Sequence, residues 1–278
     1  MDFGLCIEMA LDQLPFEQRL QKAAEIGFKH VEMWFVDMSF KGEPETLAAI
    51  AAANSVTIMN TVIGAPDGSL GGGLTDPGKR EQWLERARMT LDFNRAADIP
   101  ATIVCTGNVV PGMNGEQMRA SVLEGLKRTL DLAEEQGVTL LLEPLNTSYD
   151  HPGYFLTSSD AGAEICRELG SDRMKLLFDC YHMQVMEGDL VNHIRRNLDV
   201  IGHFHSAGVP GRHELYHGET DYRFLTQQIA EMGYQGVFGL EYAPSTEHEE
   251  SLKRTLSYLG WPSCTRKRTG IVAGRRRR

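Results

Sequence analysis

Two short stretches decide the fold that this sequence predicts, Thr139-Leu-Leu-Leu-Glu143 and Lys175-Leu-Leu-Phe-Asp179. Each is a nearly continuous apolar run that ends in a carboxylate, which is typical of a strand buried on both faces of a parallel sheet. Similar apolar, β-branched stretches recur along the chain. Together they predict eight strands: Leu5–Met9, His30–Trp34, Val56–Val62, Thr102–Cys105, Thr139–Glu143, Met174–Asp179, Val200–His205 and Val237–Glu241.

Segments of helical periodicity separate these strands. Pro15–Ile26 places a proline in a first turn, and Glu116–Gln136 is followed by Gly137, a residue suited to ending a helix. Ala24–Val31 also resembles Ala230–Val237, since each passes from a helix end through a glycine into a strand. This regular alternation predicts a parallel sheet covered by helices.

Eight strand–helix units of roughly 32 residues match the size of a (β/α)8 barrel. We therefore expect an α/β fold, a single TIM barrel over residues 1–263. A doubly wound open sheet is the alternative, but no G-x-G-x-x-G motif follows the first strand to favour it.

Charge divides the chain into an acidic body and a basic end. The net charge of the 278 residues is −10, but residues 264–278 hold seven Arg and Lys and no acid, so residues 1–263 carry −17. Such a body repels DNA and anionic membranes, whereas a small sugar or a metal cation is compatible with it. We expect no nucleic-acid or membrane partner, and a disordered tail over 264–278 without a role in function.

The cysteines and the N-terminus predict a cytoplasmic protein. The five cysteines are widely spaced without a C-x-x-C pair, which fits a reducing compartment better than a disulfide framework. The N-terminus lacks the basic and apolar regions of a secretory signal, and no apolar run approaches the roughly 18 residues of a membrane span. A homo-oligomer is compatible with the sequence.

Four polar residues end the last four predicted strands: Glu143, Asp179, His205 and Glu241. In a barrel these positions meet at the carboxyl-terminal mouth, where active sites form and where buried carboxylates need a positive partner. Three carboxylates and one imidazole suit Mn²⁺ or Mg²⁺, with Co²⁺ as a further candidate. His203 points to the same side as His205, and we assign it to a lower layer of the barrel.

Two glycine-containing connections follow strands at this mouth, Gly64–Gly78 and Ser206–Thr220. We interpret them as loops that cover a substrate. The alternative for the first is a mobile connector without a role.

Several motifs closely resemble the hydroxypyruvate isomerase family, within the xylose-isomerase-like barrel superfamily that also contains the ketose 3-epimerases. They are Leu142-Glu-Pro-Leu-Asn146, Pro152-Gly-Tyr-Phe-Leu156, Phe178-Asp-Cys-Tyr-His-Met-Gln184, Gly202-His-Phe-His205, Val209-Pro-Gly-Arg-His-Glu214 and Gly239-Leu-Glu-Tyr242. The motifs are dense over residues 142–242, and the first half of the chain agrees with the family mainly in its alternation of strands and helices.

The resemblance implies roles for individual residues. Glu143, Asp179, His205 and Glu241 hold the metal, and the two glutamates also move the proton. His182 contacts a substrate oxygen, with support of Asp179 as its alternative role. Arg212 binds a substrate hydroxyl or carboxylate, and its alternative is a salt bridge to Glu214 or Glu219.

Two departures from the family patterns point in opposite directions. Hydroxypyruvate isomerases often have glutamine at the position of His205, where ketose 3-epimerases have histidine. The epimerases carry a further glutamate at the position of Tyr149, which this chain lacks.

The expected function is a divalent-metal-dependent isomerisation of a short hydroxy-carbonyl substrate of the hydroxypyruvate or tartronate semialdehyde type. A metal chelated by the carbonyl and the adjacent hydroxyl stabilises an enediolate while Glu143 and Glu241 transfer the proton. The principal alternative is a ketose 3-epimerase, and a 3-oxo-glycoside lyase uses the same chemistry. The acidic body disfavours a DNA-cutting barrel, and the paired glutamates disfavour a non-catalytic sugar-binding barrel.

Overall fold

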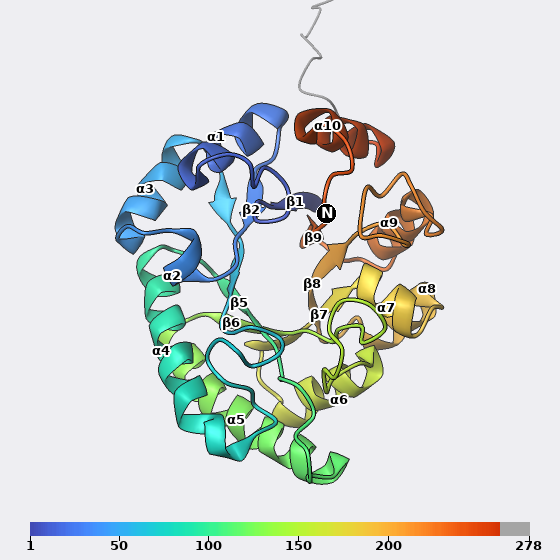
Figure 1. Cartoon of the computed structure of the whole chain (residues 1–278). Coiled ribbons are helices and arrows are strands. Elements are labelled where there is room, and N and C mark those ends of the chain that lie inside the picture. Colours follow the sequence, from blue (N-terminus) through green and yellow to red (C-terminus); the bar gives the residue numbers. More distant parts are fainter. Residues whose placement is uncertain (262–278) are drawn as a thin grey trace, which may run out of the picture.

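The computed structural model of the protein describes residues 1–261, so the basic tail over 264–278 lies outside the described residues. Strands alternate with helices throughout, and the helices form a ring around the strands (Figure 1). The strands are β1 (Asp2–Cys6), β2 (His30–Glu32), β3 (Thr57–Ile58), β4 (Asn60–Val62), β5 (Ala101–Val104), β6 (Thr139–Leu142), β7 (Met174–Asp179), β8 (Ile201–Ser206) and β9 (Val237–Leu240). The α-helices are α1 (Phe16–Ile26), α2 (Val36–Ser39), α3 (Pro44–Ala53), α4 (Arg80–Ala96), α5 (Gly115–Gln136), α6 (Ser159–Leu169), α7 (Cys180–Met186), α8 (Leu190–Asn197), α9 (Tyr222–Glu231) and α10 (His248–Tyr258).

All strand pairs are parallel, and the strand order is β3-β2-β1-β9-β8-β7-β6-β5-β4. Only Met59 separates β3 from β4, so the two ends of this order are consecutive in the chain. Two backbone hydrogen bonds join β4 to the segment after β2, from Met33 to Asn60 at 3.2 Å and from Val62 to Trp34 at 3.0 Å. The sheet is therefore a nearly closed barrel, which confirms the predicted TIM-barrel fold.

Two predicted strands differ from the observed ones. The expected strand Leu5–Met9 runs over Asp2–Cys6 instead, because β1 pairs with β9 from Asp2 onward. The expected strand Val56–Val62 is two short strands, since the chain shifts its pairing at Met59 from β2 to β5. The other six predicted strands overlap the observed ones.

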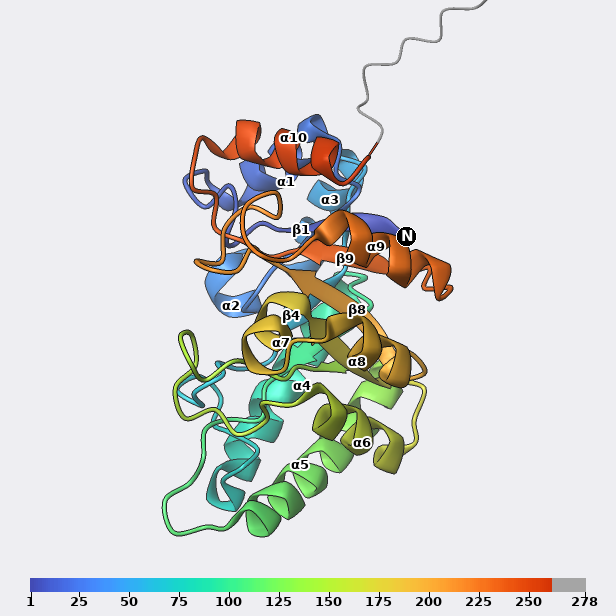
Figure 2. The same cartoon turned by 90° about the vertical axis from the view of Figure 1, so that its right-hand side faces the viewer.

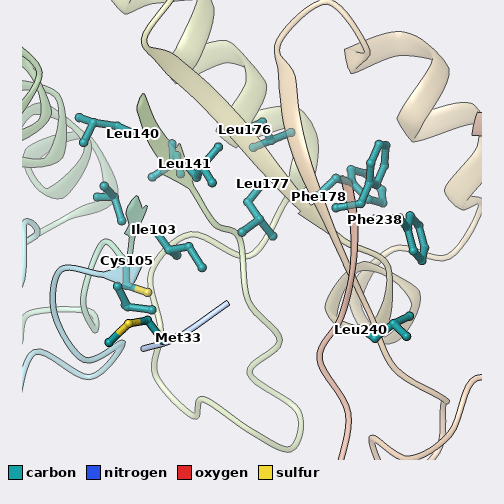
Figure 3. Close-up of a cluster of buried hydrophobic side chains, with 14 of the residues drawn as sticks. Met33, Ile103, Cys105, Leu140, Leu141, Leu176, Leu177, Phe178, Phe238 and Leu240 are labelled. Atoms are coloured by element: carbon teal, nitrogen blue, oxygen red, sulfur yellow. The ribbon is translucent and has the colours of Figure 1, made fainter. Parts of the chain in front are cut away.

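Side chains that alternate along β6, β7 and β9 build the core on both faces of the sheet (Figure 3). Phe178, Phe204 and Phe238 form one aromatic layer, with ring centroids 6.0 and 5.8 Å apart, and Tyr222 of α9 packs against its edge. Leu177 and Asp179 alternate with Phe178 and so face the opposite side, the barrel interior. The aromatic side chains packed between the sheet and the helices thus fix the strands whose alternate residues, such as Asp179, point into the barrel.

Helix ends follow their sequence signals. Asn114 and Gln117 form a reciprocal capping box at the start of α5, and Gly137 ends that helix with a φ of 72°. Gly27 ends α1 with a φ of 119°, a conformation that glycine adopts without a Cβ clash. In side view, α10 packs beside α1 and so covers the first and last strands together (Figure 2).

Within residues 1–261 no helix combines the length and apolar character that crossing a membrane requires. Cys6, Cys105, Cys166 and Cys180 are buried free thiols.

Candidate active site

The four predicted metal ligands meet at the carboxyl-terminal end of the barrel. Glu143 directly follows β6, Asp179 ends β7, His205 lies in β8 and Glu241 directly follows β9. All four side chains are buried, and one potential ligand atom of each lies within 4.8 Å of the others. The structure therefore brings together the exact set of residues that strand-end reasoning selects.

Burial and mutual repulsion make this cluster costly without a counter-charge. Burial, together with the charges of Glu143 and Glu241, raises the pKa of Asp179 to about 7. Burial likewise raises the pKa of Glu143. Burial also acts to raise the pKa of Glu241, but the positive charges of His205 and Arg212 outweigh it and lower that pKa. A cation placed among three such carboxylates relieves the repulsion.

The orientation of His205 fits a bound divalent ion. Its Nδ1 atom is buried, lies 3.5 Å from Oε1 of Glu143 and 3.4 Å from Oε2 of Glu241, and finds no hydrogen-bond partner among the described residues. Burial acts to lower the pKa of His205, but the charges of Glu241 and Glu32 outweigh it and raise that pKa, so the ring is positively charged without an ion. A bound ion would displace the proton from Nδ1, and carboxylate oxygens and a neutral imidazole nitrogen are ligands that Mn²⁺, Mg²⁺ and related ions accept. The residues present thus fit a divalent-metal centre.

A cavity of about 240 Å³ lies directly over this cluster. It is smaller than the roughly 300–1,000 Å³ of pockets for drug-sized ligands. Glu143 and Glu241 line it, whereas Asp179 and His205 lie behind them. The complete lining is Trp34, Phe35, Val62, Ala65, Pro66, Ile103, Cys105, Glu143, Leu145, His151, His182, Arg212 and Glu241.

The two residues expected to bind substrate, His182 and Arg212, both line this cavity. His182 is buried, and its Nδ1 accepts hydrogen bonds from the backbone N–H of Asn146 at 3.3 Å and from its side-chain amide at 2.7 Å. Burial, reinforced by the charge of Arg212, holds the pKa of His182 well below its ordinary value. The ring is therefore neutral and carries its proton on Nε2, which is free of hydrogen-bond partners within residues 1–261.

Arg212 comes from the loop after β8 and reaches across the cavity wall. Its Nη2 donates to Oε2 of Glu241 at 2.6 Å, and its Nη1 lies 3.7 Å from Asp150. Its guanidinium also lies 5.3 Å from the ring centre of Tyr181, which in turn donates to Asp150. Glu214, named above as an alternative partner of Arg212, instead accepts hydrogen bonds from Ser245 and Ser251.

Both long loops contribute to the cavity, as expected. Ala65 and Pro66 come from the loop Gly64–Gly78, and Arg212 comes from the loop Ser206–Thr220. A substrate-covering role for either loop stays a prediction.

Sequence reasoning missed Glu32. The expected strand His30–Trp34 placed this residue inside a strand, but β2 ends at Glu32 and its carboxylate adjoins the cluster. One oxygen, Oε1, is 3.0 Å from Nε2 of His203, and the other, Oε2, is 2.6 Å from Nε2 of His205. A carboxylate between Val31 and Met33 in an otherwise apolar stretch was the available signal.

Asn146 and Asp150 were also not assigned roles at the site, whereas the place of Trp34 at the end of the second predicted strand left open a substrate-facing role or a contact between subunits. Trp34 lines the cavity, and its indole N–H donates to Oε1 of Glu241 at 3.2 Å. Asn146 links His182 to Asp150, to which it donates at 2.6 Å.

A (β/α)8 barrel whose strand ends gather three carboxylates and a histidine under a small cavity defines a barrel enzyme that acts on a small molecule. The chain belongs to the xylose isomerase-like TIM barrel family, whose model matches residues 20–259.

Relatives of known name specify the class of reaction. The chain is 34% identical to a 2-oxo-tetronate isomerase of Cupriavidus necator over 260 residues, which cover 93% of this chain and 98% of that protein. It is 30% identical to the hydroxypyruvate isomerase of Escherichia coli K12, covering 90% of this chain and 96% of that protein. The protein is accordingly an isomerase.

Solved structures share the fold. One described as an AP endonuclease of family 2 from Brucella melitensis superposes with a TM-score of 0.85 at 25% identity, covering 92% of this chain and 98% of that one. An L-ribulose 3-epimerase superposes with a TM-score of 0.80 at 20% identity, covering 94% of each chain, and at that identity the likeness concerns the fold alone.

Proposed function

We propose that this protein is a divalent-metal-dependent isomerase of a short hydroxy-carbonyl acid, of the hydroxypyruvate–tartronate semialdehyde type or one carbon longer. One observation carries the proposal: of the four clustered ligands, only Glu143 and Glu241 line the cavity. The two groups that can both bind an ion and reach a substrate proton are therefore the two glutamates.

The size and charge of the cavity support the substrate class. Its volume of about 240 Å³ suits a short substrate. Arg212 supplies a permanent positive charge on the wall, and His182 supplies a neutral N–H donor. A carboxylate beside Arg212 and a carbonyl or hydroxyl near His182 match a short 2-oxo acid. The 34% and 30% identical relatives are both named for isomerisation of such acids.

Each residue has a separate task in the proposed mechanism. A divalent ion held by Glu143, Asp179, His205 and Glu241 supplies Lewis-acid stabilisation of negative charge on the substrate oxygens. One of the two glutamates takes the proton from the hydroxyl-bearing carbon, and a proton is delivered to the neighbouring carbonyl carbon. The hydroxyl proton moves to the former carbonyl oxygen, so the reaction is a balanced internal exchange of aldehyde and ketone.

A 3-epimerase of ketoses is the second candidate, favoured by histidine rather than glutamine at position 205. The same pair of glutamates performs it when the proton returns to the opposite face of the same carbon. Tyr149, at the position of the additional epimerase glutamate, is 74% exposed and does not line the cavity.

Isotope exchange separates the candidates. The protein with Mn²⁺ in D₂O is incubated with hydroxypyruvate or with a ketose, and products are followed by NMR. We expect deuterium incorporation and aldehyde formation from hydroxypyruvate, and loss of both in Glu143→Gln and Glu241→Gln. Exchange only at C3 of a ketose establishes the epimerase instead, and no exchange in either substrate rejects both.

A matched control is available for the two variants. Glu187 is a largely buried carboxylate outside the cavity that accepts hydrogen bonds from Ser159. Glu187→Gln makes the same chemical change at a distance from the site and should retain exchange.

A further inference from the structure

A second group of buried side chains adjoins the proposed metal ligands and shares His205 with them. It consists of Glu32, His203 and His205, which come from β2 and β8. Glu32 and His205 are 2% and 1% exposed, and His203 is 4% exposed. The proposed function gives a task to His205 alone among these residues, as a metal ligand, and none to Glu32 or His203.

The hydrogen bond between Glu32 and His205 determines which ring nitrogen faces the cavity side. A carboxylate only accepts hydrogen bonds, so the 2.6 Å contact between Oε2 of Glu32 and Nε2 of His205 places a proton on Nε2. When the ring is neutral, its lone pair is then on Nδ1, the atom that faces Glu143 and Glu241 at 3.5 and 3.4 Å. Such a carboxylate–histidine pair orients a ligand for a metal ion.

His203 holds the second oxygen of the same carboxylate. Its Nε2 lies 3.0 Å from Oε1 of Glu32, so both carboxylate oxygens have a ring nitrogen as partner. Glu32 is therefore held in place independently of His205.

The barrel leaves space for this carboxylate at a glycine. A Cβ added at Gly239 would lie 2.5 Å from Oε1 of Glu32 and 2.8 Å from Cδ2 of His205. Both distances are shorter than side-chain atoms tolerate. The Gly239-Leu-Glu241 stretch thus serves two purposes, since it delivers Glu241 to the cavity and leaves space for Glu32 behind His205.

This second group is a support rather than a second ion site. Two ligand atoms on one divalent ion, with bonds of roughly 2.0–2.2 Å, are separated by about 3 Å or more. The 2.6 Å contact of Glu32 with His205 is shorter than that, and it is an ordinary charge-assisted hydrogen bond.

We infer that Glu32 is a positioning residue, which fixes the ring of His205 through Nε2 so that Nδ1 is presented to the divalent ion, with His203 securing the second carboxylate oxygen. The inference rests on the proposed function, because it requires that His205 is a metal ligand.

The experiment compares Mn²⁺ binding by wild type and Glu32→Gln, measured by calorimetry on chelator-treated, folded protein. Replacing a carboxylate that supports a ligating histidine typically weakens metal binding about 10- to 100-fold, and we expect a loss in that range. Glu187→Gln, whose carboxylate lies near His193 outside the site, should bind Mn²⁺ as wild type does.

A spectroscopic readout separates positioning from general damage. In protein labelled with ¹⁵N-histidine and saturated with Mg²⁺, the ring signals of His205 should show a proton on Nε2 in the wild type. In Glu32→Gln we expect a mixture of ring states, with circular dichroism unchanged. Should that variant fail to fold, Glu32→Asp replaces it, because aspartate keeps the charge but has a shorter side chain. Its Mn²⁺ binding and its His205 ring signals are measured in the same way, with the same expected changes.

The outcomes distinguish the two proposals. Wild-type protein that binds neither Mn²⁺ nor Mg²⁺ overturns the proposed function and this inference together. Wild-type binding with an unchanged dissociation constant and an unchanged His205 spectrum in the Glu32 variant overturns the inference alone.

Discussion

The indole N–H of Trp34 donates a hydrogen bond to Oε1 of Glu241 at 3.2 Å. This contact orients one of the two proposed proton-transferring carboxylates from the wall of the cavity. Trp34→Phe keeps an aromatic wall but removes the donor. Hydrogen bonds to charged groups contribute about 1.5–3 kcal/mol, so we expect kcat/KM to fall roughly tenfold or more in steady-state assays.

Trp83 provides the control for this substitution. Its indole N–H donates to Thr129 at 3.0 Å in the core, and its side chain does not line the cavity. Trp83→Phe should lower the melting temperature and leave kcat/KM unchanged. Trp34→Phe should lower kcat/KM and leave the melting temperature unchanged. If both variants lose activity only in proportion to folded protein, the contact with Glu241 has no catalytic importance.

Arg212→Lys tests the proposed substrate charge. Arg212 contacts Glu241 at 2.6 Å through Nη2, and its Nε is buried without a hydrogen-bond partner in the described chain. A lysine ammonium cannot hold Glu241 and present a second donor in the same plane. We expect about a 100-fold loss of kcat/KM toward an anionic substrate, mainly through KM.

Arg167→Lys is the matched control for Arg212→Lys. Arg167 binds Asp199 through Nε at 3.0 Å and Nη2 at 2.7 Å on the outside of the barrel. Its replacement should leave both kinetic constants unchanged. Equal kinetics for Arg212→Lys and wild type would contradict a role of the guanidinium in binding.

The fold was predictable because its signals are local and repeated. The apolar runs of β6 and β7 and the helix-ending Gly137 lie within a few residues of the structures that they specify. The first and last residues of each strand were harder to predict, because pairing with strands that are distant in the sequence determines them. Asp2 joins β1 through its pairing with Val237, which no local pattern indicates.

That Glu143, Asp179, His205 and Glu241 lie close together was predictable for a related reason, since each lies at or next to the carboxyl end of a strand and parallel strands end at one mouth. Glu32 was not identified from the sequence, because its place in the site depends on a contact with His205, 173 positions later in the chain. Asp150 likewise gains its role from contacts with Tyr181 and Asn146 that only the folded loop creates. Alternation along single strands carries no information about such cross-barrel pairs.

Removal of divalent metal should destabilise the protein. The buried carboxylates of the cluster repel one another. Burial and this repulsion raise the pKa values of Glu143 and Asp179. At an Mn²⁺ concentration 100 times the dissociation constant, binding adds about 2.7 kcal/mol. For a domain of this size we expect the melting temperature to rise by about 5–10 °C over EDTA-treated protein.

Asp179→Asn is the informative variant for this stabilisation. It removes the charge of a proposed ligand that does not line the cavity. The Mn²⁺-dependent shift in melting temperature should therefore shrink, while the metal-free variant should melt at or above the temperature of the metal-free wild type. Identical melting of wild type with Mn²⁺ and with EDTA would contradict a metal centre.

The ion pair between Asp37 and Arg86 predicts a defined pH dependence of stability. Arg86 donates to both carboxylate oxygens, at 2.6 and 2.7 Å, and also to the carbonyl of Ile63, which joins α2 to α4 beside the cavity rim. The hydrogen bonds from Arg86 lower the pKa of Asp37. The stabilisation is therefore present above the unfolded-state pKa of about 3.9 and is lost as the pH falls through the lower folded-state value. Asp37→Asn should destabilise the protein by a constant amount from pH 7 to about pH 5, with the difference from wild type shrinking below about pH 4, as measured by urea unfolding in EDTA. The control repeats Asp37→Asn in an Arg86→Met background, where the group that lowers the pKa of Asp37 is absent. There the change in unfolding free energy caused by Asp37→Asn should depend little on pH. An equally large pH-dependent difference in that background would assign the pH dependence of stability to another group.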